Sequence, residues 1–522
     1  MQQFPLACDL GMATFSHFVT SSAHQTKIDS SMKCLLAICL PVILGLSLHA
    51  QPAPATTAAP AAQPGTATTA AQPGTTSAAP AVPDAIARLQ RDIPRLMEKA
   101  RVTGMGVALI RAGKLVYTGY FGYMSAAAKK PVTDQTVFEA NSLSKPAFGY
   151  AVLQLVDAGK LNLDTPLNHY LQNPGEYSDD PRINCVTARL VLSHSSGLVS
   201  AGIRGSDKMA FAFNPGEKFR YSPVGITYLS LVVQRITGLT TEDFMARSVL
   251  GPLGMRHSSY RWQPAYDSLR AYRHDWQGTT DPQRYAWEHG AACCSLQTTP
   301  DDYAQFVLAV LNGRLVNKHT WAGMLKPQIP VDSAHPGLAW GLGWGLEQTA
   351  AGTAFWHWGD ASTSKAYITA NVSAKDALIV FSNSENGLSF IRELLADGIG
   401  GEHAGAAWLG YQRYDDPSWT LLQAIVAEGA ATALKTDHPA VDETGMNAIG
   451  YKLLAIQKIA DAIAVFSQNT TDYPNSWNAW DSLGEGYMDN GDKDQAIRCY
   501  ERSMQLNPGN TNGAEQLKKL KG

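Results

Sequence analysis

The sequence predicts a mixed α/β fold of the α+β kind, with an antiparallel sheet flanked by helices, a mostly helical lobe and a C-terminal all-α repeat unit. Strand-like pairs near both ends of residues 84–415 enclose a middle dominated by helical and loop patterns. Strands from both ends of one region meet most simply in a single sheet, so the middle should form an attached lobe. Residues 416–522 are helical and repeat with a fixed period.

Composition and charge exclude several classes of protein. The 522 residues include 42 basic and 45 acidic side chains, which give a formal net charge of −3. This balance provides no electrostatic footprint for nucleic acid or anionic lipid, so no nucleic-acid partner is expected. The seven cysteines are too few and too irregularly spaced for a disulfide scaffold or a paired zinc site.

The N-terminal residues differ from the rest of the chain. Residues 32–50 carry a lysine, an apolar run and small residues, which is typical of a secretory signal peptide. The run is shorter than the ~20 residues of a membrane-spanning helix. We expect export with cleavage after Ala50, a retained membrane anchor being the alternative, and interpret residues 1–31 as an over-extended reading frame. The uncharged Pro/Ala/Thr-rich residues 51–83 predict a linker.

The folded body begins with a helix and a hairpin and ends with a hairpin and a helix. The first helical pattern covers residues 85–100, and the last runs to Leu395. The strand-like runs, two at each end of the body, cover residues 106–111, 115–121, 366–372 and 377–383. Short turn-forming segments separate the two members of each pair, as hairpins require.

Candidate chemistry begins at Ser142, which precedes an apolar-periodic stretch and should lie in the first turn of a helix. Lys145 follows three residues later, on the same helix face. A serine hydroxyl is a poor nucleophile until a base takes its proton, and a lysine amine acts as a base only when its pKa of ~10.4 is lowered. The spacing alone is weak evidence, because Ser30/Lys33 and Ser362/Lys365 repeat it.

Three further segments follow in order, at residues 187–198, 214–222 and 357–359. With Ser142 and Lys145, this set resembles the serine β-lactamase and penicillin-binding-protein-like hydrolases, in the branch of class C β-lactamases, DD-peptidases and esterases. The resemblance covers residues 85–396 and implies a β-lactamase/transpeptidase-like fold. It also implies catalysis that requires no metal and no organic cofactor.

The resemblance implies a role for each matched residue. Ser142 would be acylated, with Lys145 as the partner that takes its proton. Tyr221 would shuttle a proton between Ser142 and the leaving group, and His357 would border the cleft as a cation or a hydrogen-bond donor. The oxyanion hole would consist of the backbone N–H groups of Ser142 and Asp360.

The resemblance also implies that Ser222, Trp358 and Gly359 line the substrate cleft, the glycine letting substrate approach the backbone. Two residues depart from the family pattern. Pro223 stands where an asparagine is usual, and it offers no side-chain donor or acceptor. Asp360 stands where small neutral residues are common, and its carboxylate would be unfavourable beside an oxyanion. Efficient β-lactam hydrolysis is therefore not expected.

Two other features are interpreted as structural. His194, within residues 193–198, is expected to serve folding rather than proton transfer. Cys293 and Cys294 lie in a loop where the family often has glycines, and two buried thiols are expected there, a vicinal disulfide being the alternative.

The C-terminal region repeats with an offset of 34 residues, as Gly450/Gly484 and Phe466/Tyr500 illustrate. Small residues let paired helices approach, and the aromatic residues fill the seam. This pattern resembles two tetratricopeptide repeats. Because two repeats are fewer than usually stand alone, we expect added support from a helix at residues 421–434, a helix at residues 513–520, or docking on the catalytic body. A packing role and recruitment of a protein partner both remain open.

Taken together, the sequence predicts a secreted or periplasmic serine hydrolase that forms an acyl-enzyme at Ser142. Its substrate would be a small ester or amide, or a D-amino-acid peptide of the cell wall, and it would be a poor β-lactamase. The alternative is a catalytically silent adaptor that binds peptidoglycan or peptide and uses the repeats to bind protein.

Overall fold

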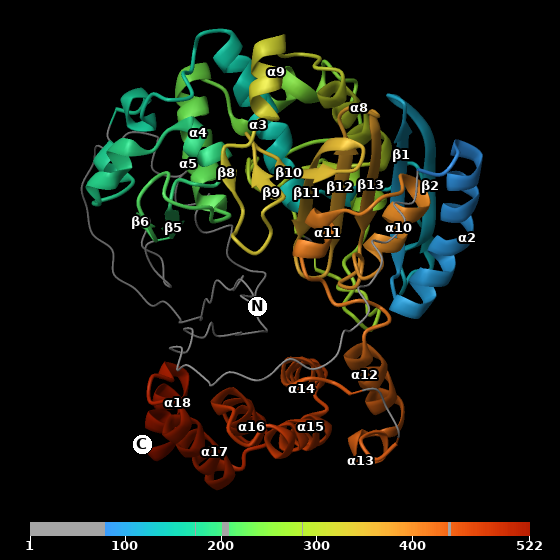
Figure 1. Cartoon of the computed structure of the whole chain (residues 1–522), viewed down its shortest axis with the longest axis vertical. Helices are drawn as coiled ribbons and strands as arrows, with labels where there is room; N and C mark the ends of the chain where they lie inside the picture. Colours follow the sequence, from blue (N-terminus) through green and yellow to red (C-terminus); the bar gives the residue numbers. More distant parts are fainter. Residues whose placement is uncertain (1–78, 173, 201–207, 284, 437–439) are drawn as a thin grey trace, which may run out of the picture. The chain divides into compact units, whose positions relative to one another are not determined.

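The computed structural model describes residues 79–522, except residues 173, 201–207, 284 and 437–439 (Figure 1). These residues separate into two compact units, a sheet unit that ends at Tyr411 and a repeat unit, Gln412–Gly522. The sequence predicts the boundary after residue 415. The predicted signal peptide, and the linker up to residue 78, lie outside the described residues. No helix in the part of the chain that the structure describes is long and apolar enough to cross a bilayer.

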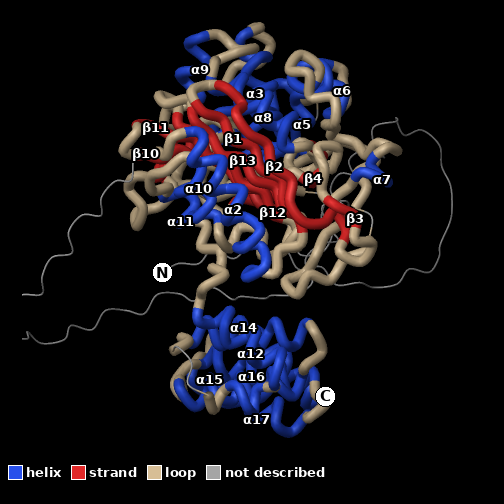
Figure 2. The backbone as a smooth tube through the Cα atoms, turned by 90° about the vertical axis from the view of Figure 1, so that its right-hand side faces the viewer, coloured by secondary structure: helices blue, strands red, loops and turns tan. Residues whose placement is uncertain are grey.

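A nine-stranded antiparallel sheet forms the centre of the sheet unit, in the order β3-β2-β1-β13-β12-β11-β10-β9-β8 (Figures 1 and 2). Its strands are β1 (Gly104–Arg111), β2 (Lys114–Ser125), β3 (Lys130–Pro131), β8 (Ile329–Pro330), β9 (Leu338–Trp340), β10 (Gly345–Thr349), β11 (Gly352–Asp360), β12 (Lys365–Asn371) and β13 (Asp376–Ser382). The two predicted hairpins meet because β1 pairs with β13, from Met105 opposite Ser382 to Ile110 opposite Ala377. The single sheet predicted from both ends of the region is thus confirmed.

The strands β8, β9 and β10 lie in the region for which the sequence predicts helices and loops. They contain two, three and five residues. Such short strands cannot show the repeated alternation that identifies a strand in a sequence. They extend the sheet beyond β11, so that β11 is an interior strand.

Helices cover both faces of the sheet (Figure 2). On one face, Gly398 of α10 (Ile391–Gly398) packs against Leu109 and Leu378, and α10 lies beside α2 (Val82–Ala100). On the other face, Pro300 at the start of α8 (Pro300–Leu311) packs against Gly106. The strands β1 and β13 are therefore apolar on both faces, which explains their almost continuous hydrophobic sequence.

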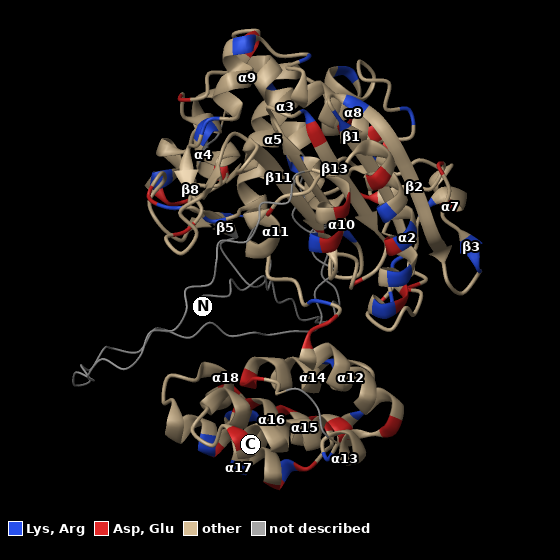
Figure 3. Cartoon of the chain, turned by 45° about the vertical axis from the view of Figure 1, so that its right-hand side comes forward, with Lys and Arg blue, Asp and Glu red and all other residues tan. Residues whose placement is uncertain are grey.

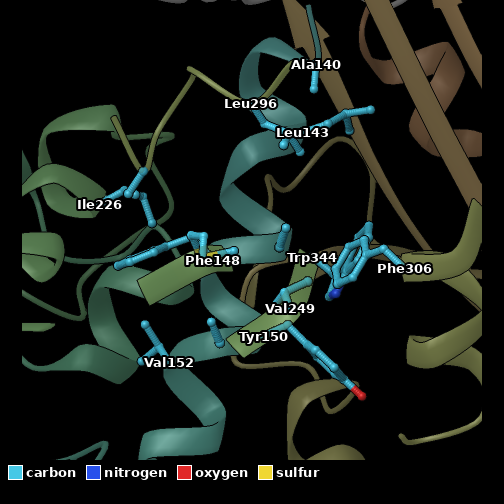
Figure 4. Close-up of a cluster of buried hydrophobic side chains, with 14 of the residues drawn as sticks. Ala140, Leu143, Phe148, Tyr150, Val152, Ile226, Val249, Leu296, Phe306 and Trp344 are labelled. Atoms are coloured by element: carbon cyan, nitrogen blue, oxygen red, sulfur yellow. The ribbon is translucent and has the colours of Figure 1, made fainter. Parts of the chain in front are cut away.

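The lobe is built mainly of helices around α3 (Ser144–Asp157). The other helices of this unit are α4 (Ala188–Leu192), α5 (Pro223–Thr237), α6 (Thr241–Met245), α7 (Tyr266–Leu269), α9 (Lys318–Met324) and α11 (Ala404–Trp408). Two small antiparallel pairs complete it, β4 (Phe138–Glu139) with β7 (Gln297–Thr298) and β5 (Leu198–Ser200) with β6 (Met209–Phe211). Figure 4 shows Phe148, Tyr150 and Val152 of α3 in the core with Ile226 and Trp344. Because α3 is buried along most of its length, it is a rigid base for the residues at its N-terminus.

The repeat unit consists of α12 (Pro417–Glu428), α13 (Ala430–Ala433), α14 (Glu443–Ala455), α15 (Ile459–Asp472), α16 (Trp477–Asp489), α17 (Lys493–Leu506) and α18 (Thr511–Lys521). A Cβ atom at Gly450 would lie 2.2 Å from the Phe466 ring, and one at Gly484 would lie 3.1 Å from the Tyr500 ring. These are the two glycine and aromatic pairs of the predicted repeat, so the stacked helical architecture is confirmed. The single helix predicted over residues 421–434 is instead two helices, because Gly429 between them has φ 85°.

Charged side chains do not gather by sign in either unit. Figure 3 shows basic and acidic residues interspersed over the helices and loops of each. The mixing of the two signs along the described ribbon agrees with the near-neutral composition.

Candidate active site

The nucleophile turn is a short 3-10 helix, η1 (Asn141–Leu143), directly before α3. Ser142 therefore precedes the α-helix rather than lying in its first turn. Asn141 has φ 50°, in the left-handed region that asparagine tolerates better than most residues, and its Nδ2 donates to the Ser364 Oγ at 3.1 Å. Ser142 is partly exposed, whereas Leu143 and Ser144 are buried. The turn thus presents one hydroxyl to the outside.

Ser142 and Lys145 meet as their spacing predicts. The Lys145 Nζ donates to the Ser142 Oγ at 2.9 Å and to the backbone carbonyl of Cys293 at 2.8 Å. The lysine side chain is buried, with the residue 2% exposed. Burial favours the neutral amine, but Tyr221 and the two neighbouring cysteine thiols outweigh it and raise the pKa of Lys145. In the resting site, the lysine is therefore an ammonium group that donates to the serine.

Tyr221 lies over this pair inside an aromatic enclosure. Its ring centroid is 4.3 Å from that of His194 and 4.7 Å from that of Trp358, and the Lys145 Nζ lies 4.9 Å from it. Burial raises the pKa of the Tyr221 hydroxyl, although Lys145 and Ser142 nearby oppose that rise. The hydroxyl makes no hydrogen bond of ordinary geometry to any described residue. It is a neutral phenol that lies close to Ser142 and Lys145, near enough for both to affect its pKa.

His194 positions Tyr221, a function that sequence reasoning missed. Its backbone carbonyl accepts from the Arg220 N–H at 2.8 Å, and its Nδ1 accepts from the Ser222 N–H at 3.1 Å. The histidine thus bonds to the residues on both sides of Tyr221, while its ring packs against the tyrosine ring at an interplanar angle of 34°. Burial, with positive Lys145 nearby, holds the pKa of His194 well below its ordinary value, so the ring remains neutral and Nδ1 remains an acceptor.

Ser222 does not line the cleft as predicted. Its Oγ donates to the Leu198 carbonyl at 2.6 Å and accepts from the Gly225 N–H at 3.1 Å, as the N-cap of α5. Both functions of the hydroxyl are used within the fold. Pro223 follows as the first helical residue, where a missing N–H and a fixed φ are favourable. The capping motif therefore explains the proline at this departure from the family pattern.

Gly359 lies on β11 against the nucleophile turn. An added Cβ atom would lie 2.3 Å from the Ala140 carbonyl oxygen and 3.2 Å from the Asn141 Cβ. The sequence predicts a glycine that lets substrate approach, but the nucleophile turn itself occupies the side-chain position. The glycine allows β11 to approach that turn closely. Trp358, predicted to line the cleft, packs against Tyr221 and is 6% exposed.

His357 cannot be the cation that the resemblance allows. It is fully buried, and its pKa is lowered to about 3, first by burial and then by the charge of Lys145. Its Nδ1 must donate to the Trp358 carbonyl, at 2.8 Å, because a carbonyl oxygen only accepts. The Nε2 of the neutral ring is then an acceptor, and it has no partner among the described residues. In the resting site, His357 therefore has no ring N–H group left to donate to a substrate.

The carboxylate of Asp360 forms an ion pair with Lys365. Its Oδ1 accepts from the Lys365 Nζ at 2.5 Å, and its Oδ2 accepts from the Tyr411 hydroxyl at 2.7 Å. Lys365 has a side chain only 7% exposed. The positive partner offsets the negative charge that the sequence places beside the predicted oxyanion hole.

A buried polar network supports the nucleophile turn from behind. The Arg273 Nη2 lies 2.7 Å from the Glu139 Oε2, which also accepts from the Ser364 Oγ at 3.2 Å. Ser364 in turn accepts from Asn141, as described above. Nothing in the sequence marks this network, because Glu139 and Arg273 are separated by 134 residues and belong to no motif. No cluster of three or more His, Cys, Asp or Glu side chains that could hold a metal occurs within the described ranges.

The fold and the site define the class of protein. A partly exposed serine bonded to a buried lysine, with a tyrosine beside them, stands between a helix-covered antiparallel sheet and a helical lobe. This is the arrangement of serine acyl-transfer proteins that use a lysine in place of a histidine. The chain belongs to the β-lactamase family, whose model matches residues 89–397. A tetratricopeptide repeat model matches residues 477–510.

Individual relatives are similar over part of the chain. Esterase EstB of Burkholderia gladioli is 29% identical over 201 residues, which are 33% of this chain and 51% of that protein. Protein flp of Staphylococcus aureus is 24% identical over 251 residues, 44% of this chain and 49% of that protein. The chain thus spans about half the length of the curated relatives it matches.

Solved structures share the fold of the sheet unit. EstCE1, described as a hydrolase with promiscuous acyltransferase activity, superposes with a TM-score of 0.54 at 19% identity, covering 61% of this chain and 99% of that one. The D-alanine carboxypeptidase AmpC of Burkholderia cenocepacia gives 0.52 at 18% identity, covering 60% and 99%. At these identities the likeness concerns the fold alone.

Proposed function

We propose that the protein is a serine hydrolase that forms an acyl-enzyme at Ser142 and acts preferentially on small esters. The observation that carries this proposal is the 2.9 Å hydrogen bond between the buried Lys145 Nζ and the hydroxyl of the partly exposed Ser142. The similarity to esterase EstB supports the choice of ester substrates. Amides and D-amino-acid peptides are the other substrate classes within this proposal.

The proposed reaction begins when Lys145 and Tyr221 together have lost one proton. The resulting base takes the proton of Ser142, whose Oγ attacks the ester carbonyl carbon. The backbone N–H groups of Ser142 and Asp360 bind the oxyanion. The proton passes through Tyr221 to the leaving alcohol as its C–O bond breaks. Water then attacks the acyl-enzyme, its proton returns to Ser142, and the carboxylic acid leaves.

The preference for esters follows from the start of α5. Pro223 stands at the position where the family usually has asparagine, and its side chain offers neither a hydrogen-bond donor nor an acceptor to a substrate amide. An ester has no N–H group, so its binding does not require a side-chain acceptor at this position. We therefore expect aryl ester turnover to exceed that of a cephalosporin or of a D-alanyl-D-alanine peptide.

A fluorophosphonate probe followed by peptide mapping tests the proposal. The wild-type protein should be labelled at Ser142, and Ser142→Ala should lose both the label and ester hydrolysis, by about 10³-fold or more. Ser362→Ala is the matched control, because Ser362 heads another Ser-x-x-Lys sequence but is exposed on a loop. Its label and activity should be retained. Absence of label on wild-type Ser142 would refute the hydrolase and favour the catalytically silent adaptor.

We also propose that the protein is exported through residues 32–50. The basis is the sequence pattern of those residues. N-terminal sequencing of protein recovered outside the cytoplasm should begin after Ala50. An N-terminus at or before Met32 in that fraction would support the retained anchor instead.

A further inference from the structure

Two adjacent cysteines lie directly behind the catalytic lysine. The Sγ atoms of Cys293 and Cys294 are 2.9 Å apart. Cys293 is buried, at 2% exposed, whereas Cys294 is partly exposed. The proposed reaction uses neither thiol. The pair is therefore a second reactive group within the site, with one member that solvent reaches.

The backbone between the two cysteines is part of the site. The carbonyl that accepts from the Lys145 Nζ, at 2.8 Å, is that of Cys293. This carbonyl belongs to the peptide bond that joins Cys293 to Cys294. Any change in the orientation of that peptide plane moves the acceptor of the catalytic lysine.

A disulfide between neighbouring residues would change that orientation. Adjacent Cα atoms are ~3.8 Å apart across a trans peptide, below the ~4.4–6.8 Å that most disulfides span. The eight-membered ring formed by such a bond includes the peptide itself, so ring closure twists it. The carbonyl oxygen turns with the plane, and Lys145 loses its acceptor.

The loop around the cysteines cannot absorb this twist by moving as a whole. On the far side, the Leu296 N–H donates to the Ser144 Oγ at 2.9 Å, which ties the loop to α3. The Ser295 Oγ donates to the Tyr260 carbonyl at 2.7 Å and accepts from the Ala291 N–H at 2.8 Å. Both flanks of the dithiol are thus fixed, and the change concentrates on the Cys293 carbonyl.

We propose that Cys293 and Cys294 form a reversible modification site whose oxidation by a peroxide to a vicinal disulfide switches off the acyl transfer at Ser142. This inference about regulation rests on the proposed hydrolase function. The more exposed Cys294 sulfur attacks one peroxide oxygen, the O–O bond breaks, and a sulfenic acid and water form. The Cys293 sulfur then attacks the Cys294 sulfur, the S–O bond breaks, and a second water leaves as the S–S bond forms. The two thiols lose two electrons in total, and the peroxide is reduced.

The test combines intact mass with ester hydrolysis before and after hydrogen peroxide and after subsequent reduction by a phosphine. In the wild-type protein, the peptide holding both cysteines should lose two hydrogen atoms, and kcat/KM should fall by about 10²-fold, since the lysine is displaced. The phosphine should restore both. Cys294→Ala keeps the Cys293 carbonyl but cannot close the ring, so its kcat/KM, compared with its own value before treatment, should resist the peroxide. Cys185→Ala, which removes an exposed thiol elsewhere, should remain as sensitive as the wild type.

Each contrary outcome overturns the proposal. Absence of the two-hydrogen loss excludes the disulfide, and its presence with unchanged activity excludes the switch. Equal inactivation of the wild type and Cys294→Ala places the sensitive group elsewhere. Failure of the hydrolase function is recognised separately, because Ser142 would then take no fluorophosphonate under reducing conditions, while the mass still reports whether the disulfide forms.

Discussion

The two units of the molecule make their decisive contacts at very different separations along the chain. In the sheet unit, Lys145 bonds to a carbonyl 148 residues away, and Asn141 bonds to Ser364, 223 residues away. In the repeat unit, the Tyr451 hydroxyl bonds to Glu485, 34 residues away, at the repeat period. The site therefore depends on segments brought together from the whole sheet unit, whereas each repeat depends on its immediate neighbours. Substitutions in the sheet unit should therefore reduce activity, whereas substitutions in the repeat unit should reduce only the stability of that unit.

Apart from the loss of the Ser142 hydroxyl itself, the largest effect is expected for Gly359→Ala, at the contact between β11 and the nucleophile turn. The new Cβ would lie 2.3 Å from the Ala140 carbonyl, so the turn or the strand must move. We expect kcat for an aryl ester to fall by about 10²-fold and the unfolding free energy by about 1–3 kcal/mol. Gly337→Ala, whose Cβ would meet no atom within 4 Å, is the control. Comparable losses in both variants would contradict the role of the close approach.

The pH dependence of ester hydrolysis is the next prediction. Burial raises the pKa of Tyr221, and Tyr221 with the two thiols raises that of Lys145, so the base form is scarce at neutral pH. The value of kcat/KM should therefore rise with pH, by about tenfold per pH unit below the apparent pKa of the pair. His357, with a pKa lowered to about 3, stays neutral throughout and should add no step near neutrality. A step near pH ~6.5 that disappears in His357→Gln would contradict this.

A smaller effect is expected at His194, which acts on the reaction through Tyr221. His194→Ala removes the Nδ1 acceptor of the Ser222 N–H, and we expect about a tenfold loss of kcat with little change in KM. His194→Asn is the conservative variant. It tolerates the left-handed backbone, φ 54° at this residue, and offers a side-chain oxygen as acceptor. It should recover part of the loss, and equal kcat values for the two variants would exclude the backbone bond as the cause.

Substitutions in the repeat unit are expected to leave ester hydrolysis unchanged. In Gly450→Ala, the Cβ would lie 2.2 Å from the Phe466 ring, whose other side faces Gly486, where an added Cβ would lie 3.2 Å from the ring. We expect a loss of about 1–3 kcal/mol in the unfolding of this unit. Gly484→Ala meets the Tyr500 ring at 3.1 Å, and the ~1 kcal/mol gain in helix propensity should offset much of that strain. Urea unfolding and ester assays measure both. Reduced ester hydrolysis in either variant would show that the two units are energetically coupled.

The same contrast explains what the sequence could predict. The helix α2, both hairpins and the stacked repeats were predictable, because each is encoded in a local or periodic pattern. Ser142 and Lys145 were identifiable because a spacing of three residues brings both side chains to one face of a helical turn. The later motif segments distinguished this pair from the other Ser-x-x-Lys sequences.

The remaining features of the site had no local signal. The packing of His194 against Tyr221 and the support of Asn141 by the buried Glu139 network join segments with no common period. Ser222 was assigned to the cleft because its neighbour Tyr221 belongs to a motif, yet the helix that begins beside it uses its hydroxyl as a cap. Which side chains face the cleft depends on such local competition for hydrogen bonds.

The pairing of β1 with β13 also determines when the site can be completed during biosynthesis. Met105 is synthesised long before Ser382. The edge of β1 that pairs with β13 therefore remains unpaired while the lobe is synthesised. The nucleophile turn likewise has no strand behind it until Gly359 has emerged. A nascent chain therefore carries Ser142 in an unfinished setting while the 217 residues from there to Gly359 are added. The site can take its final form only after β11 and β13 have been made.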